Sequence, residues 1–193
     1  MNILLGVTGS VAAIKTQQII DNIRGEAEKC GLVINGLVVI VSRAAEMFVK
    51  LDDIRGADFC FTDDAEFRPE NLWKQKGDPV LHIDLRKWAD ILVIAPLTAH
   101  TMAKLANGLC DTLLTSIVRA WDFSKPIILF PAMNTLMWNH PLTNVHLDVL
   151  TRILKAVVIQ PLHEKTLACG DVGPGALPDP MEIAKLVLRQ ILS

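Results

Sequence analysis

The sequence predicts an α/β domain in which helices cover both faces of one open parallel sheet. Short apolar runs alternate with helical stretches, which is the order of elements expected of βαβ units. The runs are rich in Val, Ile and Leu and lack period-two alternation, as in strands that are buried on both faces. Hydrophobic residues make up 51% of the 193 residues, which favours a doubly covered sheet, a buried subunit interface, or both.

The elements follow one another along a chain that has no internal repeat or linker, so we expect residues 1–193 to form a single domain. The predicted strands are Ile3–Val7, Val33–Val41, Ile91–Ala95, Ile127–Phe130 and Val157–Gln160. A short strand, Asp58–Phe61, lies within the polar segment Leu51–Pro79, which is otherwise interpreted as a surface connection. The predicted helices are Val11–Arg24, Thr101–Ala106, Thr112–Trp121, Leu142–Leu154 and Pro180–Leu192.

Charge and composition exclude several classes of protein. Nineteen basic and twenty-one acidic side chains give a net charge of −2 without a basic run, so a nucleic-acid partner is not expected. No apolar stretch reaches the ~18 residues of a membrane span, and the N-terminus lacks the charged region of a signal peptide. The four cysteines are scattered without a metal-ligand spacing. We therefore expect a cytoplasmic protein with reduced cysteines and no metal site.

The segment Gly6–Ala13 joins the first strand to the first helix. Glycine permits a tight turn, and the amides that open the helix, together with Ser10, form an anion site. The spacing matches neither a dinucleotide fingerprint nor a Walker loop, so a single phosphate fits better than a dinucleotide or ATP. The alternative is an ordinary turn with a serine cap.

Polar side chains also follow two other predicted strands. Ser42 ends the second strand, and Thr98 and Thr101 follow the third main strand. Because ligands of open α/β sheets bind at the carboxyl ends of the strands, we expect these hydroxyls to face the ligand. The alternatives are capping roles, with Ser42 as the N-cap of a helix Arg43–Lys50.

Two further segments combine unusual residues. Pro131–Trp138 places two Met and one Trp in what reads as a loop, which predicts that it closes over a flat ligand or inserts into a neighbouring subunit. Cys169 lies among the glycines of Leu167–Gly175, where a core role and a functional role are both open. His82 stands between apolar neighbours, which is typical of a structural histidine.

Taken together, these segments resemble the flavin-dependent cysteine decarboxylases, and within that family the branch that acts on a phosphopantothenoyl substrate in coenzyme A biosynthesis. The resemblance covers nearly the whole chain except Leu51–Pro79, and its most specific part is Pro-Ala-Met-Asn-Thr-Leu-Met-Trp. The matching strings are Gly6–Ala13, His82–Asp90, Ala95–Ala99, Pro131–Trp138 and Ala168–Gly175.

The resemblance implies a flavodoxin-like fold, bound FMN, and a homotrimer whose active sites lie where subunits meet. It implies that His82 is the base that assists oxidation of the substrate and that Cys169 is the proton donor of the reducing step. The substrate is expected to contact Asn134, Met137 and Ala168. The residues expected to bind the cofactor are Gly9, Ser10, Val11, Ser42, Thr98, Ala99, His100, Thr101 and Ala132.

The chain departs from the family pattern at three places. The family usually has Asn at the positions of His100 and Thr112, and its usual Gly-x-Met-Ala-Glu-Pro string reads Gly175–Pro180 here. The alternative functions are a peptidyl-cysteine decarboxylase and a non-catalytic phosphatase-regulating homologue. The second is disfavoured because the chain shows no acidic extension. Nothing in the chain closely resembles the prenyl-phosphate site of a flavin prenyltransferase.

Overall fold

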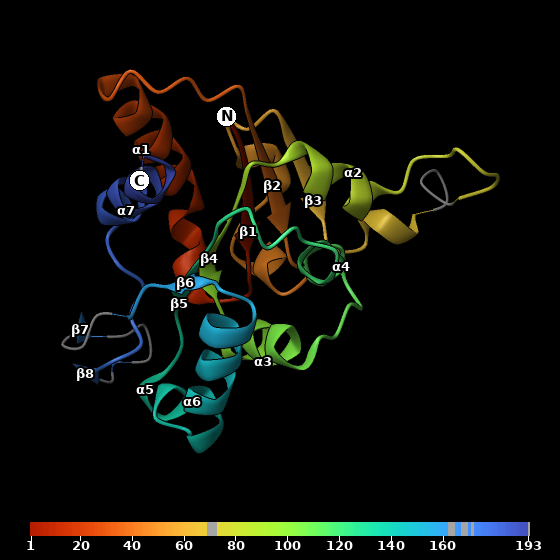
Figure 1. The fold of residues 1–193 in the computed structure, drawn as a ribbon. Helices are drawn as coiled ribbons and strands as arrows, with labels where there is room; N and C mark the ends of the chain where they lie inside the picture. Colours follow the sequence, from red (N-terminus) through yellow and green to blue (C-terminus); the bar gives the residue numbers. More distant parts are fainter. Residues whose placement is uncertain (69–72, 162–164, 167–169, 171, 193) are drawn as a thin grey trace.

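A six-stranded parallel sheet forms the centre of the protein, as seen in a computed structural model that describes residues 1–68, 73–161, 165–166, 170 and 172–192 (Figure 1). The strand order is β3-β2-β1-β4-β5-β6, and every neighbouring pair is parallel. The strands are β1 (Asn2–Val7), β2 (Gly36–Val41), β3 (Phe59–Thr62), β4 (Ile91–Leu97), β5 (Ile127–Pro131) and β6 (Val157–Val158). This confirms the predicted α/β class.

Helices cover both faces of the sheet, which explains the continuous apolar runs of its central strands. One face packs against α1 (Thr16–Lys29) and α7 (Pro180–Leu192), which contact each other. The other face packs against four helices and one π-helical turn. The helices are α2 (Leu81–Trp88), α3 (Ala99–Asn107), α4 (Leu113–Arg119) and α6 (Pro141–Asp148), and the turn, Val149–Ile153, follows α6.

The direction of the strand order reverses between β1 and β4. From β1 the chain moves outward through β2 to β3, then returns to place β4 on the other side of β1 and continues to β5 and β6. Ligands of open α/β sheets bind outside the carboxyl ends of the strands at such a reversal. Thr8 follows β1 and Thr98 follows β4, so these two threonines mark that point.

Several predicted boundaries were wrong. The helix Arg43–Lys50, which was considered as the alternative interpretation of Ser42, is only a short 3-10 turn, Ala45–Met47, with the Ser42 side chain accepting from the amide of Ala45. The first helix begins with a 3-10 turn, Val11–Lys15, and continues to Lys29 rather than ending at Arg24. The second strand begins at Gly36, and the last strand is only two residues long.

Two short helices were not predicted. They are α2 and α5 (Thr135–Trp138), and the small hairpin β7–β8 (Lys165–Thr166 and Val172–Gly173) was also missed. Only Leu85 of the eight residues of α2 is buried, so this helix is too short, and buries too little, for its pattern to mark it in the sequence. Across the described parts of the chain, no helix is both long enough and apolar enough to cross a membrane.

Candidate active site

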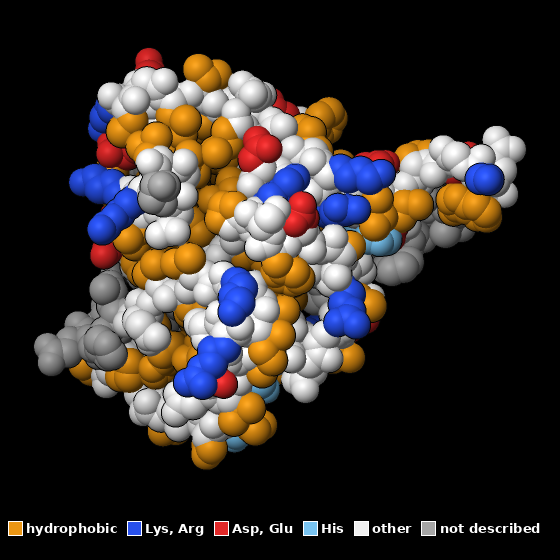
Figure 2. Space-filling view, in the orientation of Figure 1, with side chains coloured by type: hydrophobic (Ala, Val, Ile, Leu, Met, Phe, Trp, Pro, Cys, Tyr) orange, Lys and Arg blue, Asp and Glu red, His pale blue; other side chains and the backbone are white. Residues whose placement is uncertain are grey.

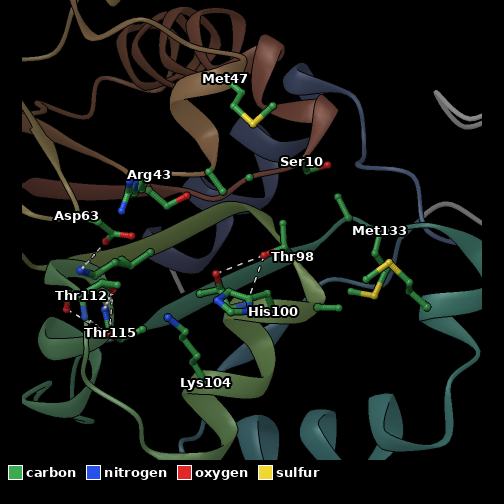
Figure 3. A pocket seen from close by; sticks show the side chains of 18 of the residues that line it. Ser10, Arg43, Met47, Asp63, Thr98, His100, Lys104, Thr112, Thr115 and Met133 are labelled. Atoms are coloured by element: carbon green, nitrogen blue, oxygen red, sulfur yellow. Dashed lines mark hydrogen bonds between the residues drawn. The ribbon is translucent and has the colours of Figure 1, made fainter.

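A cavity of about 880 Å³ opens at the carboxyl ends of the strands, beside the reversal between β1 and β4. Figure 3 shows Ser10, Arg43 and Met47 on one side of it, facing Thr98 and, from α3, His100 and Lys104. Asp63, Thr112 and Thr115 close one end, and Met133 lies at the other (Figure 3). The volume lies within the ~300–1,000 Å³ range of small-molecule and cofactor sites.

The cavity brings together most of the residues that the sequence singled out. Eight of the nine expected cofactor-binding residues line it, and so do the expected substrate residues Asn134 and Met137. The eight are Gly9, Ser10, Ser42, Thr98, Ala99, His100, Thr101 and Ala132. Val11 does not line the cavity and is nearly half exposed.

Besides Val11, one other described site residue does not line the cavity. His82 belongs to α2 and lies outside the cavity lining, with its ring against Glu66. Ala168 and Cys169 lie outside the described residues. The catalytic assignments therefore remain predictions.

The buried side chain of Thr8, which follows β1, forms hydrogen bonds to the end of β4. The Thr8 hydroxyl donates a 2.8 Å hydrogen bond to the carbonyl of Pro96 and accepts one of 2.8 Å from the amide of Thr98. Thr98 then caps α3, because its hydroxyl accepts from the amide of Thr101. Thr8 is fully buried, so these bonds form away from water and fix the start of α3 at the cavity wall.

Ser10 and Ser42 present hydroxyls to the cavity from two neighbouring loops. Each oxygen accepts a hydrogen bond of 3.3 Å from a nearby amide, Ser10 from Ala12 and Ser42 from Ala45. A serine that accepts through its oxygen retains a hydrogen with which to donate. The two loops touch, since a Cβ added to Gly9 would collide with Ala44. Glycine is therefore required at this contact.

Charged side chains gather at the end of the cavity formed by α3 and the start of α4. Burial raises the pKa of the Asp63 carboxyl, although hydrogen bonds from the Leu114 amide and the Thr112 side chain favour its ionised form. Nζ of Lys104 lies 2.7 Å from Oδ2 of Asp111, and this hydrogen bond holds the pKa of the Asp111 carboxyl below its usual range. Thr112 caps α4 in a reciprocal arrangement with Thr115.

The corner that follows β5 forms the opposite end. Asn134 caps α5 by accepting from the amide of Leu136 at 2.8 Å, which orients its side-chain amide. Gly175 packs directly on this corner, because its carbonyl accepts from the amide of Met133 at 2.9 Å. Gly175 has a φ of +131°, and an added Cβ would collide with the Met133 carbonyl. The last residue of the glycine-rich segment Leu167–Gly175 thus lies against Met133, which lines the cavity.

These residues fit a flavin mononucleotide. The amides at the start of α3 and the hydroxyls of Ser10 and Ser42 are donors of the kind that bind a phosphate. Ala99, Ala132, Met133 and Met137 provide the apolar surface that a flat ring system needs.

Sequence reasoning missed several residues of the lining. Arg43, Ala44 and Met47 were considered only as part of the alternative helix after Ser42, and Asp63 and Lys104 carried no motif of their own. The remaining lining residues that were not among the predicted site residues are Thr112, Leu114, Thr115 and Met133. The signal that could have identified Asp63 is its place directly after a short strand, where β3 ends.

The sequence matches the family model described as Flavoprotein over residues 1–192. It is 45% identical over 185 residues to a phosphopantothenoylcysteine decarboxylase of Oryza sativa subsp. japonica, a match that covers 96% of this chain and 78% of the relative. The chain belongs to the flavoprotein family. Its predicted resemblance to flavin-dependent cysteine decarboxylases is confirmed.

Solved structures agree with this assignment. A PPC (phosphopantothenoylcysteine) decarboxylase mutant complexed with pantothenoylaminoethenethiol superposes with a TM-score of 0.87 at 41% identity, covering 100% of this chain and 98% of that one. The FMN-binding protein AtHal3 superposes with a TM-score of 0.81 at 44% identity, covering 98% and 95%. The expected flavodoxin-like architecture is thereby confirmed.

Proposed function

We propose that this flavoprotein decarboxylates 4′-phosphopantothenoylcysteine to 4′-phosphopantetheine, with FMN as its cofactor, in coenzyme A biosynthesis. The observation that carries the proposal is the cavity at the β1–β4 reversal, where eight of the nine expected cofactor-binding residues meet Asn134 and Met137. The relatives at 41–45% identity that bear this activity in their names support it. The enzyme would be a carbon–carbon lyase.

The chemistry explains why a flavin is needed. Loss of CO₂ from an N-acylated cysteine leaves an electron pair on Cα that no neighbouring group accepts. When bound, FMN supplies the missing electron sink, because it takes two electrons from the thiol-bearing carbon and later returns them. No net oxidation results, so the protein needs no second substrate.

The residues of the chain supply position and protons. We assign His82 as the base that takes a proton during the oxidation, since an imidazole accepts protons near neutral pH. Asn134 would hold the substrate carboxylate through its NH₂ group, and Met137 and Ala168 would shape the subsite. Cys169 would return the proton when the ene-thiol is reduced. The relative complexed with pantothenoylaminoethenethiol is a cysteine-to-serine mutant, and an ene-thiol is what such a variant should retain.

We further propose that the protein is a homotrimer in which a neighbouring subunit delivers His82. Two observations support self-association: His82 lies outside the cavity of its own chain, and large apolar side chains are exposed around the cavity. Met47 is 82% and Leu136 78% exposed, and Figure 2 shows apolar surface over the region of α5 and α6. Free Cys30, Cys60 and Cys110 support a cytoplasmic location, because exported proteins tend to pair their cysteines.

Subunit mixing tests this arrangement. His82→Asn and Asn134→Ala should each abolish activity. A co-refolded mixture should regain part of it, because some sites then combine an intact His82 with an intact Asn134. A mixture as inactive as its components, or a monomer by light scattering, would contradict the shared site.

A substrate comparison tests the activity itself. FMN-loaded protein should release CO₂ from 4′-phosphopantothenoylcysteine and form 4′-phosphopantetheine, while a peptide with a C-terminal cysteine should remain unchanged. The peptidyl-cysteine alternative predicts the reverse. Two structural relatives described as FMN-dependent cysteine decarboxylases, SpaF and TvaF, are 26% and 29% identical to this chain. The phosphopantothenoylcysteine decarboxylase of Oryza sativa subsp. japonica is 45% identical, which favours the phosphopantothenoyl substrate.

A further inference from the structure

A carboxylate contacts His82 at two atoms. Glu66 lies in the 3-10 turn Ala65–Phe67 after β3, and His82 lies in the first turn of α2. Oε2 of Glu66 accepts a 2.8 Å hydrogen bond from the backbone amide of His82, and Oε1 lies 3.0 Å from the ring nitrogen Nδ1. The two side chains are only 13% and 26% exposed, so the contact is largely shielded from water.

The turn that carries Glu66 is itself held in place. Ala65 is buried in the core cluster that also contains Leu85 of α2. On the other side of the turn, Arg68 donates a 2.7 Å hydrogen bond to the Thr62 hydroxyl, and that hydroxyl donates to Asp64. Glu66 therefore faces α2 on a turn that is fixed by packing and by side-chain bonds.

The contact has a consequence for the protons of the imidazole. Nδ1 is buried and makes no aligned hydrogen bond with any described residue, although Oε1 of Glu66 lies only 3.0 Å away. An ionised carboxylate can only accept a hydrogen bond. The favoured tautomer of neutral His82 is therefore the one with its proton on Nδ1, which leaves the lone pair on Nε2.

We propose that Glu66 is a positioning residue for His82, which holds the imidazole in the Nδ1–H tautomer so that Nε2 is the proton acceptor. This inference rests on the proposed role of His82 as the base. Before substrate binds, such contacts are often poorly aligned, and they tighten in the complex. Glu66 would act through His82 and would not touch the substrate.

A purely structural role is the alternative. Val80, the N-cap of α2, makes no capping bond with its side chain, and Glu66 supplies a cap from outside by accepting from the amide of His82. A negative charge also stabilises the start of a helix. The test therefore has to separate the effect on the imidazole from the effect on the helix.

Glu66→Gln separates the two. Its carbonyl oxygen can still accept from the amide of His82, while its NH₂ group would donate to Nδ1 and drive the proton to Nε2. In FMN-loaded protein with ¹⁵N-labelled histidine, NMR should show His82 as Nδ1–H in the wild type and Nε2–H in the variant. Flavin reduction by substrate should slow about 10- to 100-fold, by analogy with the loss of carboxylate partners of metal-binding histidines. FMN affinity should not change.

Asp84→Asn is the matched control, because it removes an equal charge from the first turn of the same helix, where Asp84 is exposed. It should alter neither the tautomer nor the rate of flavin reduction. A wild-type His82 that carries its proton on Nε2 would overturn the inference without any variant. A Glu66→Gln protein that loses thermal stability but keeps the wild-type tautomer and the wild-type rate of flavin reduction would also overturn the inference.

The outcomes also separate this inference from the proposed function. If His82→Asn reduces flavin at the wild-type rate, the assignment of His82 as the base is wrong, whatever Glu66 does. If His82→Asn is inactive and Glu66→Gln reduces flavin like the wild type, the base assignment stands and the role of Glu66 is refuted.

Discussion

Replacing Thr8 with valine tests how the fold holds the cavity wall. Valine keeps the branched shape of threonine but removes the hydroxyl that accepts from the Thr98 amide. The Pro96 carbonyl keeps its bond from the backbone amide of Thr8, so the change leaves one donor unpaired, that of Thr98. Loss of a partner for a shielded amide costs about 1–3 kcal/mol. For a chain of this size, that corresponds to a melting temperature lower by about 2–12 °C.

Thr8→Ser is the matched control, because it keeps the hydroxyl and loses only a buried methyl group, worth about 0.8 kcal/mol. Thermal melts and FMN titrations of both variants should show a larger loss in FMN affinity for valine, since Thr98 caps the helix that lines the cavity. A Thr8→Val protein as stable as the wild type, with unchanged FMN affinity, would refute this account of the wall.

Three further changes have distinct expected results. Gly175→Ala should destabilise by about 1–3 kcal/mol in urea unfolding, because its φ is +131° and its Cβ would meet the Met133 carbonyl. Gly25→Ala, inside α1 with open space around it, should instead stabilise by about 0.5–1 kcal/mol; a loss would contradict the helix geometry. Asp63→Asn should raise the melting temperature of flavin-free protein at neutral pH, because burial raises the pKa of this carboxyl and so penalises its ionised form. The gain in melting temperature should vanish below about pH 3.9, the pKa of an aspartate in the unfolded chain. A gain that stays constant across pH would contradict burial of the carboxylate as its cause.

The sheet and the loops that carry Ser10 and Thr98 could be predicted because their signals are local. Each central strand is a short apolar run, and Ser10 and Thr98 stand directly after two such runs. Parallel strands place their carboxyl ends on one edge, so sequence position alone places these residues together. The motif that contains Asn134 was also recognisable without the fold.

The missed residues depend on contacts that have no local signal. Asp63 and Glu66 come from the polar segment Leu51–Pro79, where no periodicity marks a strand or a helix strongly. Their partners, the start of α4 and His82 in α2, are reached only when the chain folds back. The alternative helix after Ser42 does not form for a related reason, since Ala44 packs directly against Gly9 of another loop.

A single-turnover experiment with Cys169→Ser tests the central claim most directly. Oxidation and decarboxylation should proceed with FMN, His82 and the carboxylate contacts intact. Reduction of the ene-thiol should then stall, because serine is a far weaker acid than a thiol, whose reference pKa is about 8.5. After one substrate addition, CO₂ and flavin absorbance are measured together, with the wild type as the control. The account predicts one equivalent of CO₂ per flavin, bleached flavin and an accumulated ene-thiol, and continued turnover to 4′-phosphopantetheine would contradict it.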